Sequence, residues 1–513
     1  MYHSISFVLF AVIYLLLTLA LYKLFNERAL YPLHMLQLEG YDEGEYRAWI
    51  SANGEKIRTF HYQPTSEKTP LVMTDRATRL FNVHRMLNRL LLALTLLVSI
   101  AVYGVSSFLS SVVFAILCLL IGFYQYVILI YANRMNAPKE RKINQGFYDA
   151  AQEKVRVLKE KGLQVVGITG SFGKTSTKFI TSTVLEEAFV VQNTPSSYNT
   201  PMGLSKVIND ELDEKDEIFL AELGAKVPGE ITEVAELVQP SIGIITAIGP
   251  THMHLFKTIE NIQKTKYELI EALGEEGVAI FNYDNEYVKP LADKTTKRTV
   301  RYGMEDIEKL DVYAKDVVVH ERGSAFTLGF KEKGEVKAET KLLGKHNISN
   351  LLAAAGVGYV LGMEPEAIAR GIAKVEPVEH RLNIVDGGTG IVVIDDAFNS
   401  NPVGARAALD VLGQFEKGKK IIVTPGMVEL GDMEEEENYK FGKEIAKVCD
   451  VAVLVGPKRT APIQKGLRDA GFQQDKMIVA KNLDEATASL GKVAVVGDVV
   501  LFENDLPDTY DEA

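Results

Sequence analysis

The stretch from Val165 to Thr177 constrains the fold of this chain more than any other part of it. The apolar run from Val165 to Ile168 is typical of a buried parallel strand, and a turn with Gly170 and Gly173 follows it. Beyond this turn the chain reads as the start of a helix. Glycines let backbone N–H groups close around phosphate oxygens, and a helix N-terminus adds partial positive charge. The pattern therefore predicts a phosphate-binding loop in an α/β fold.

Two side chains at the predicted helix start extend this interpretation. Lys174 is placed to reach the outer phosphates of a nucleotide, and the Thr175 hydroxyl to bind Mg²⁺. The strict P-loop pattern has a glycine five residues before Gly173, where this chain has Ile168. The loop is therefore a variant of the P-loop.

Length, charge and cysteine content narrow the class of protein. A chain of 513 residues is too long for one hydrophobic core, so two to four domains are expected. A net charge of -12 argues against a nucleic acid as partner. Cys118 and Cys449 are the only cysteines, which excludes a disulfide framework and fits a reducing compartment.

Three apolar runs near the N-terminus, at about 5–24, 88–105 and 109–131, predict three transmembrane helices. A cleaved signal peptide is the alternative for the first run, but no basic residue precedes it. Basic residues concentrate between the first and second runs and after the third, so both segments are expected in the cytoplasm. The 25–87 insert is then cytoplasmic, and its Trp49 is expected to anchor at the membrane interface.

The rest of the chain alternates apolar β-type runs with helical stretches, as parallel α/β sheets do. A pause near Pro377 separates two such series. The sequence therefore predicts a membrane segment at 1–143, one α/β domain at 144–377 and a second at 378–513.

Several polar residues follow predicted strands of the first α/β domain. Glu222 ends the run from Ile218, a position that faces the metal in nucleotide-binding sheets. His252 and His254 lie at another strand exit, but no cysteine is near, which argues against zinc. Asn282 follows a further strand, where it either contacts a base edge or makes a turn.

The order of these motifs resembles the Mur ligase family, the ATP-dependent amino-acid ligases of peptidoglycan synthesis, and most closely its D-alanyl-D-alanine-adding MurF branch. The likeness runs from about Gly162 to about Leu501. Seven motifs in the family's order are far more specific than any one of them. They are 169–175, 222–225 with 228–231, 249–252, 264–266, 282–285, 344–350 and 395–402.

The resemblance implies a central ATPase domain, a Rossmann-like C-terminal domain and the cofactors ATP and Mg²⁺. It implies that Lys174, Lys266 and His252 are catalytic, with Lys266 carbamoylated as in many members. The implied metal site comprises Thr175, Glu222, His252 and Lys266. The implied ATP site comprises Thr169, Gly170, Ser171, Gly173, Lys174, Thr175, Ser176, Asn282, His346, Asn347, Arg381 and Asp396.

The implied reaction has two steps. A substrate carboxylate attacks the γ-phosphate of ATP, and an amine then attacks the acyl phosphate to give an amide, ADP and phosphate. The expected partners are a small-molecule or lipid-linked cell-wall precursor, an amino acid or dipeptide, and the membrane.

Three departures from the family pattern bear on the substrate. The membrane segment stands where the family's UDP-binding domain is expected. The loop from Tyr198 to Gly203 lacks the second asparagine that usually follows Asn199. Glu503-Asn504-Asp505 replaces Lys-Gly-Ser, and acids there disfavour an anionic substrate. Two alternatives therefore stay open: a membrane-bound ligase of the poly-γ-glutamate synthase type, and a non-catalytic membrane scaffold.

Overall fold

The computed structural model describes residues 2–54, 70–196, 198–386, 388–398 and 400–506. The chain divides near Gln145 into two compact units, one helical and one with two sheets. The part of the predicted insert at 55–69 lies outside the described residues. The fold class expected from the sequence is confirmed: apolar N-terminal helices precede a two-sheet α/β unit.

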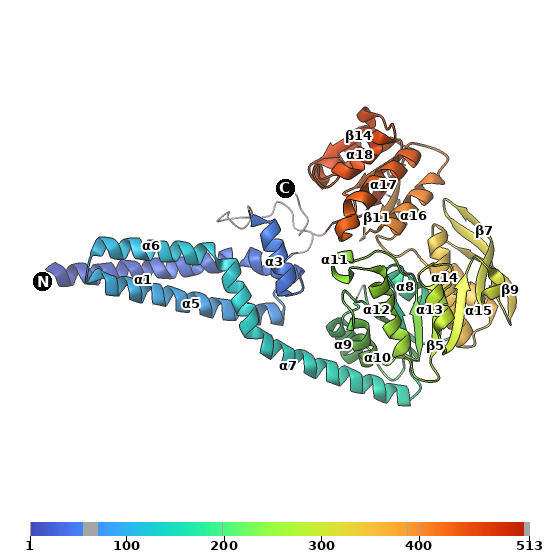
Figure 1. Ribbon diagram of the computed structural model, residues 1–513, viewed down its shortest axis with the longest axis horizontal. Coiled ribbons are helices and arrows are strands. Elements are labelled where there is room, and N and C mark those ends of the chain that lie inside the picture. The colour runs from blue at the N-terminus through green and yellow to red at the C-terminus, as the bar shows by residue number, and fades with distance from the viewer. Residues whose placement is uncertain (1, 55–69, 197, 387, 399, 507–513) are drawn as a thin grey trace. The chain divides into compact units, whose positions relative to one another are not determined.

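Three long helices run side by side in the N-terminal unit (Figure 1): α1 (Tyr2–Arg28), α5 (Asp75–Tyr103) and α6 (Ser107–Phe123). α1 and α5 are long and apolar enough to cross a membrane, and α6 makes a third span only together with the start of α7 (Gln125–Glu160). A bend of 65° separates α6 from α7. The run expected as one helix at 109–131 is thus two helices that meet at Tyr124.

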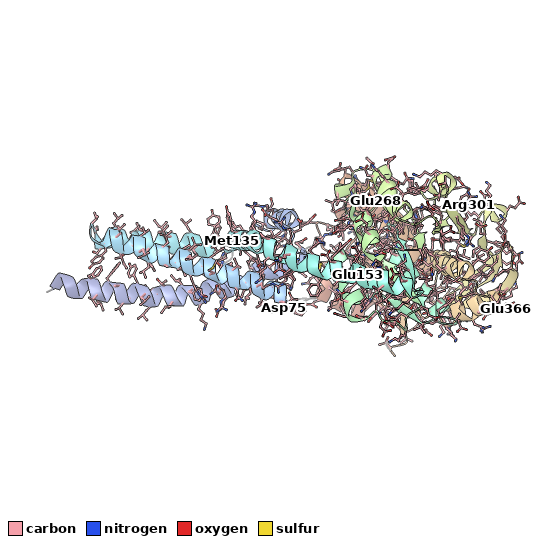
Figure 2. The ribbon with its side chains drawn as sticks, turned by 90° about the horizontal axis from the view of Figure 1, so that it is seen from below. Asp75, Met135, Glu153, Glu268, Arg301 and Glu366 are labelled. Atoms are coloured by element: carbon pink, nitrogen blue, oxygen red, sulfur yellow. The ribbon has the colours of Figure 1, made fainter. Side chains whose placement is uncertain are left out.

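The predicted insert forms a small helical core in its described part. α2 (Leu30–Leu38) and α3 (Glu43–Ala52) pack against the start of α5, which begins at Asp75 (labelled in Figure 2), and against α7. Trp49, expected at the membrane interface, is instead 6% exposed and stacks on Tyr46 at 5.9 Å between ring centres. Burial of a large aromatic surface stabilises this core, so Trp49 is a packing residue.

The second unit contains a nine-stranded sheet in the order β2-β3-β1-β4-β5-β6-β7-β8-β9 within the described residues. The strands from β2 to β7 are parallel, and β8 and β9 complete the edge as an antiparallel meander. Apolar clusters cover both faces, which explains the continuous apolar strand sequences. The strands are β1 (Gln164–Thr169), β2 (Val191–Asn193), β3 (Ile218–Glu222), β4 (Ile242–Ile245), β5 (Val278–Asn282), β6 (Arg298–Gly303), β7 (Val312–His320), β8 (Gly323–Phe330) and β9 (Gly334–Thr340).

Helices between β1 and β6 form the crossovers that connect the parallel strands of this sheet (Figure 1), whereas α7 precedes β1 and two further helices follow β9. One face is packed by the C-terminal part of α7 with α9, α10 and α12, and the other by α8, α14 and α15. The helices are α8 (Lys174–Leu185), α9 (Pro201–Asp210), α10 (Glu230–Val238), α11 (Met253–Phe256), α12 (Ile259–Glu271), α13 (Lys289–Lys294), α14 (Lys345–Val360) and α15 (Pro365–Lys374).

A six-stranded sheet in the order β10-β11-β15-β12-β13-β14 forms the rest of the unit. Only β10 is antiparallel to its neighbour. Its strands are β10 (Asn383–Asp386), β11 (Val392–Asp396), β12 (Lys420–Thr424), β13 (Val451–Val455), β14 (Met477–Ala480) and β15 (Val499–Glu503). Its helices are α16 (Pro402–Gly413), α17 (Glu434–Val448), α18 (Ala461–Asp469) and α19 (Leu483–Val493).

Two acids lie beside each other at the carboxyl ends of the central strands of this sheet, because Asp396 of β11 is in register with Glu503 of β15. Glu503 is fully buried and accepts hydrogen bonds from the Ser400 and Thr424 hydroxyls. Burial raises the pKa of Glu503 to about 8 and that of Asp396 to about 7. Of the acids that replace the family's cations, Glu503 is therefore internal to the sheet and already bonded to protein hydroxyls, whereas Asp505 is exposed.

These raised pKa values predict a pH-dependent stability. Between about pH 4 and 8 the folded protein keeps protons on Glu503 and Asp396 that the unfolded chain has lost. The contribution of these two acids to stability is therefore complete near pH 4 and is lost as the pH rises through about 8. We expect the free energy of unfolding of full-length protein to fall by a few kcal/mol between pH 5 and 8.5, since each tenfold change in proton affinity is worth about 1.4 kcal/mol. In urea titrations Glu503→Gln should flatten this profile. A pH-independent wild-type midpoint would contradict the prediction.

Candidate active site

The carboxyl ends of β3, β1, β4 and β5 bring the predicted phosphate loop, Glu222, the segment before His252 and Asn282 to one edge of the sheet. Ligands of parallel α/β sheets bind at this edge. The sequence predicted each of these as a strand exit, and the sheet order makes them neighbours.

The phosphate loop has the backbone geometry that its glycines allow. Gly170 and Gly173 have φ values of +155° and +80°, and a Cβ on Gly170 would lie 2.1 Å from the Thr246 hydroxyl. The Ser171 N–H donates to the Ala247 carbonyl at 2.7 Å, and the Thr246 hydroxyl donates to the Phe172 carbonyl at 2.6 Å. The loop is thus held by the segment that follows β4, with α8 starting directly behind it.

Lys174, the first residue of α8, folds back over the loop. Its Nζ donates to the carbonyl oxygens of Gly170 at 2.8 Å and Ser171 at 3.3 Å. Burial lowers the pKa of Lys174, while the charge of Glu222 opposes this effect. The ammonium therefore lies at the loop mouth, where a bound phosphate would replace weak carbonyl acceptors with charged oxygens.

Glu222 ends β3 and is 1% exposed. Its Oε1 accepts a hydrogen bond from Asn199 Nδ2 at 3.0 Å, and its Oε2 lies 3.5 Å from Lys178 Nζ. Lys178 is fully buried on α8 and also donates to the Ser196 carbonyl. Lys178 and Asn199 therefore hold the Glu222 carboxylate in one orientation. Through Asn199, the 194–200 loop is attached to this carboxylate.

The donor set fits Mg²⁺. Oε2 of Glu222 is buried and, apart from the Lys178 ammonium at 3.5 Å, no described residue donates to it; Thr175 is 7% exposed at the start of α8. Mg²⁺ commonly takes one or two protein oxygens and completes its shell with phosphate and water. In the described part of the chain no group of three or more His, Cys, Asp or Glu side chains could hold a metal.

His252 makes a different contact from the one expected. Its backbone is left-handed at φ +48°, and its Nδ1 lies 2.8 Å from Glu429 Oε2 in the segment that follows β12. The histidine therefore joins the two sheets of the unit, and its expected role as a metal ligand stays a prediction. The side chain of His254 is outside the described part of the structure.

Lys266 lies on α12 with 3% of its surface exposed. Its Nζ is 3.5 Å from the Ala225 carbonyl and 5.8 Å from the centre of the Phe256 ring. Burial, with a smaller effect from the charge of Lys174, lowers the pKa of Lys266 to about 7. A large fraction of this amine is neutral near pH 7, and the neutral amine is the form that reacts with CO₂.

The residues expected at the adenine and in the ATP-site motif make hydrogen bonds within the protein. Asn282 Nδ2 donates to Ser349 Oγ at 3.1 Å, and Asn347 donates to the Leu343 carbonyl at 2.9 Å. Asn350 donates to Asn347 and accepts from Thr177 of α8 at 3.2 Å. The motif at the start of α14 is thereby tied to the phosphate helix. Burial lowers the pKa of His346 to about 4, so this histidine is neutral.

Arg381 lies between two residues with left-handed backbones, His380 and Leu382. Its guanidinium is 4.3 Å from the centre of the Phe398 ring, and the charges of Glu222 and Asp396 act on it against the cost of its burial. A cavity of about 570 Å³ extends from here along α8, between Thr175, Phe179 and the residues 374–381. Arg381, expected in the ATP site, and α8 therefore line one space.

Three cationic side chains thus interact with two carboxylates. The charge of Glu222 acts on the pKa values of Lys174, Lys178 and Arg381. The charge of Asp396 also acts on Arg381, and that of Lys174 acts on Lys266. Buried positive charge in this excess stabilises polyanions. The arrangement can hold nucleotide phosphates and neutralise charge on a transferring phosphoryl group.

Sequence reasoning missed several of these residues. Asn199 and Asn350 were part of quoted segments but received no role, and Lys178, Thr246 and Glu429 received none either. Only the position of Lys178 could have indicated a role in the site, because it lies four residues after Lys174 and so on the same face of the expected helix.

Lys178 gives a direct prediction. Lys178→Met should remove the ion-pair partner of the buried Glu222 carboxylate and cost about 3 kcal/mol of stability. It should also lower kcat/KM about 10- to 100-fold, because the carboxylate and the 194–200 loop lose their common support. Adding Glu222→Gln should recover stability but not activity. Urea unfolding and ATP turnover check both parts, and a singly mutated protein with full activity would contradict the positioning role.

Family models match both parts of the α/β unit. The Mur ligase middle domain matches residues 168–358, and the model described as Mur ligase, glutamate ligase domain matches residues 380–503. The chain is 32% identical over 348 residues to the UDP-N-acetylmuramoyl-tripeptide–D-alanyl-D-alanine ligase of Bacillus subtilis, a match covering 67% of this chain and 74% of the relative. The Mycobacterium tuberculosis protein of that name is 34% identical over 366 residues, covering 67% and 70%.

Solved structures agree in fold. MurF from Acinetobacter baumannii superposes with a TM-score of 0.64 at 24% identity, over 72% of this chain and 78% of that one. MurF from Thermotoga maritima, solved in complex with ADP, gives 0.62 at 25% identity, over 72% and 82%.

Proposed function

This chain belongs to the Mur ligase family of ATP-dependent amide ligases, and we propose that it joins D-alanyl-D-alanine to the carboxyl end of a muramoyl tripeptide at the membrane. The dipeptide and tripeptide follow the names of its relatives. The observation that carries the proposal is the set of three cationic side chains, Lys174, Lys178 and Arg381, that interact with Glu222 at the predicted phosphate loop. The poly-γ-glutamate and scaffold alternatives gain no support from these relatives.

The first step is phosphoryl transfer. The tripeptide carboxylate attacks the γ-phosphorus of ATP, a bond to the carboxylate oxygen forms, and the bond to the β–γ bridging oxygen breaks. Lys174 and Arg381 neutralise the equatorial oxygens during this transfer. Thr175 and Glu222 would hold Mg²⁺, which supplies Lewis acid stabilisation of the phosphates when bound.

The second step is acyl transfer. The free amine of the dipeptide attacks the acyl carbon, the bond to the phosphate oxygen breaks, and the amine loses a proton as phosphate leaves. Residues from both sheets surround the site, and the cavity along α8 is the candidate binding site for the peptide substrates. Excluding water here protects the acyl phosphate from hydrolysis.

Lys266 is proposed to carry a carbamate. Its lowered pKa favours the reactive neutral amine, and the product is a carboxylate-like group. Peptide mass spectrometry after trapping in bicarbonate tests this, and an unmodified, fully active enzyme would refute it.

The function is tested with full-length protein in nanodiscs. We expect ADP release only when ATP, UDP-N-acetylmuramoyl-tripeptide and D-alanyl-D-alanine are present together, with the ligated product identified by mass spectrometry. Replacing the dipeptide with glutamate distinguishes the polymer-forming alternative. ADP release with glutamate but not with the dipeptide would overturn the proposed acceptor.

We also propose a multi-pass location in the cell membrane with the α/β unit in the cytoplasm. α1 and α5 carry the apolar lengths for this, and the bent α6–α7 pair supplies the third crossing. After replacement of Cys118 and Cys449, an impermeant thiol reagent added to intact cells should label Ser107→Cys and spare Ala48→Cys. Both positions are exposed. Labelling of Ala48→Cys alone would reverse the orientation.

A further inference from the structure

Two arginines meet one tyrosine where the apolar parts of α1 and α5 end. The Tyr22 hydroxyl accepts hydrogen bonds from Arg89 Nε at 2.9 Å and Arg85 Nε at 3.3 Å. The arginines are four residues apart and therefore share one face of α5. The Arg89 guanidinium also lies 5.3 Å from the centre of the Tyr22 ring.

A buried amide network fixes this meeting point. Asn88, between the two arginines in sequence, is fully buried and donates to Asn26 Oδ1 of α1 at 3.1 Å. Asn88 also exchanges two hydrogen bonds of 3.1 Å with Gln125 at the start of α7. Satisfied amides inside an apolar bundle specify one alignment of its helices. Tyr22 and the arginine face of α5 are therefore held in register.

Three other arginines of this unit have carboxylate partners. Arg79 forms a two-bond pair with Glu140, at 2.6 and 2.8 Å. Arg134 and Arg47 both bind Glu43, at 2.6 and 2.7 Å. Across the described residues neither Arg85 nor Arg89 lies within ion-pair distance of an acid, and their partner is a neutral hydroxyl.

The hydrogen bonds to Tyr22 leave the terminal N–H groups of both arginines available as donors. Each arginine uses its Nε toward Tyr22, so the terminal nitrogens of both guanidinium groups keep N–H donors for an anion. The guanidinium plane matches the oxygen spacing of phosphate, and two such groups on one helix face can bind a single phosphate together.

The surroundings indicate a lipid as the source of that phosphate. Leu90 and Leu94, directly beyond the pair on α5, are 59% and 58% exposed, and Leu19 on α1 is 58% exposed. The arginines therefore stand at the polar limit of an apolar surface, where headgroups lie if the helices span a membrane.

We propose that Arg85, Arg89 and Tyr22 form a binding site for the phosphate group of a membrane lipid. The inference rests on the proposed membrane insertion. An anionic phospholipid and a polyprenyl-phosphate carrier of the acyl donor share this chemistry. In the second case the site would keep the donor at the surface where the ligase works, which raises its effective concentration.

The test measures lipid binding independently of catalysis. Full-length protein in phosphatidylcholine nanodiscs is titrated with phosphatidylglycerol in one arm and polyprenyl phosphate in the other, and bound lipid is quantified by native mass spectrometry. Arg85→Gln/Arg89→Gln should weaken binding at least tenfold, and Tyr22→Phe should weaken it several-fold, because the arginines lose their common anchor.

Arg47→Gln/Arg134→Gln is the matched control, since it removes the same charge from the same unit at carboxylate-paired positions. It should leave lipid binding unchanged. Preference for polyprenyl phosphate identifies a carrier site, and equal or greater binding of phosphatidylglycerol identifies a headgroup site. Unchanged binding of both lipids by the Arg85/Arg89 variant, or equal loss in the control, overturns the proposal. Lipid binding is measured without substrate turnover, so a loss of ligase activity would not change how these binding results are interpreted.

Discussion

Lys174→Met is expected to reduce ATP-dependent ligation by about 10³-fold, since it removes a preorganised charge from the transferring phosphoryl group. Lys174 Nζ lies on the carbonyls of its own loop and makes no ion pair within 4.0 Å in the described residues, so the folded protein should keep its stability. Product formation under saturating ATP and substrates measures the loss.

The matched control is Lys492→Met. Lys492 is exposed on α19 of the second sheet and takes no part in the site, so its variant should ligate at the wild-type rate. Urea unfolding of both variants separates loss of chemistry from loss of fold. Ligation by Lys174→Met within tenfold of wild type would mean that the glycine turn is a structural connection.

Glu222→Gln should lower turnover by about 10²-fold and weaken nucleotide binding only when Mg²⁺ is present. The amide keeps the size of the side chain and one acceptor for Asn199, but it is a poor ligand for a hard cation. Calorimetric titration of ADP with and without Mg²⁺ gives a readout besides activity. We expect the Mg²⁺-dependent gain in affinity to be lost.

Glu217→Gln provides the same substitution at the other end of the strand. Glu217 precedes β3 and accepts a hydrogen bond from the Val190 N–H at 2.9 Å, far from the carboxyl edge where the phosphate loop lies. This control should keep the Mg²⁺ effect. Equal behaviour of the two variants would remove Glu222 from the metal site.

The membrane segment shows how far apolar composition alone can predict structure. The runs at 5–24 and 88–105 correspond to parts of α1 and α5, because a long apolar stretch favours a helix whatever surrounds it. The same composition could not predict the 65° bend at Tyr124, nor that Trp49 packs on Tyr46 in a core of its own. Both depend on contacts between helices that are distant in sequence.

Residue order was enough to predict a phosphate loop, the parallel sheets and the family, because each of these rests on local chemistry. Positive-φ glycines, a buried strand and a helix start must follow one another within a few residues. The groups that surround Glu222, and the residue that His252 contacts, become known only from the folded chain. Lys178 and Asn199 reach the carboxylate from different elements, and Glu429 reaches the histidine from the second sheet. Such pairs form through chain crossovers between strands, and residue spacing does not encode which exposed ends then meet.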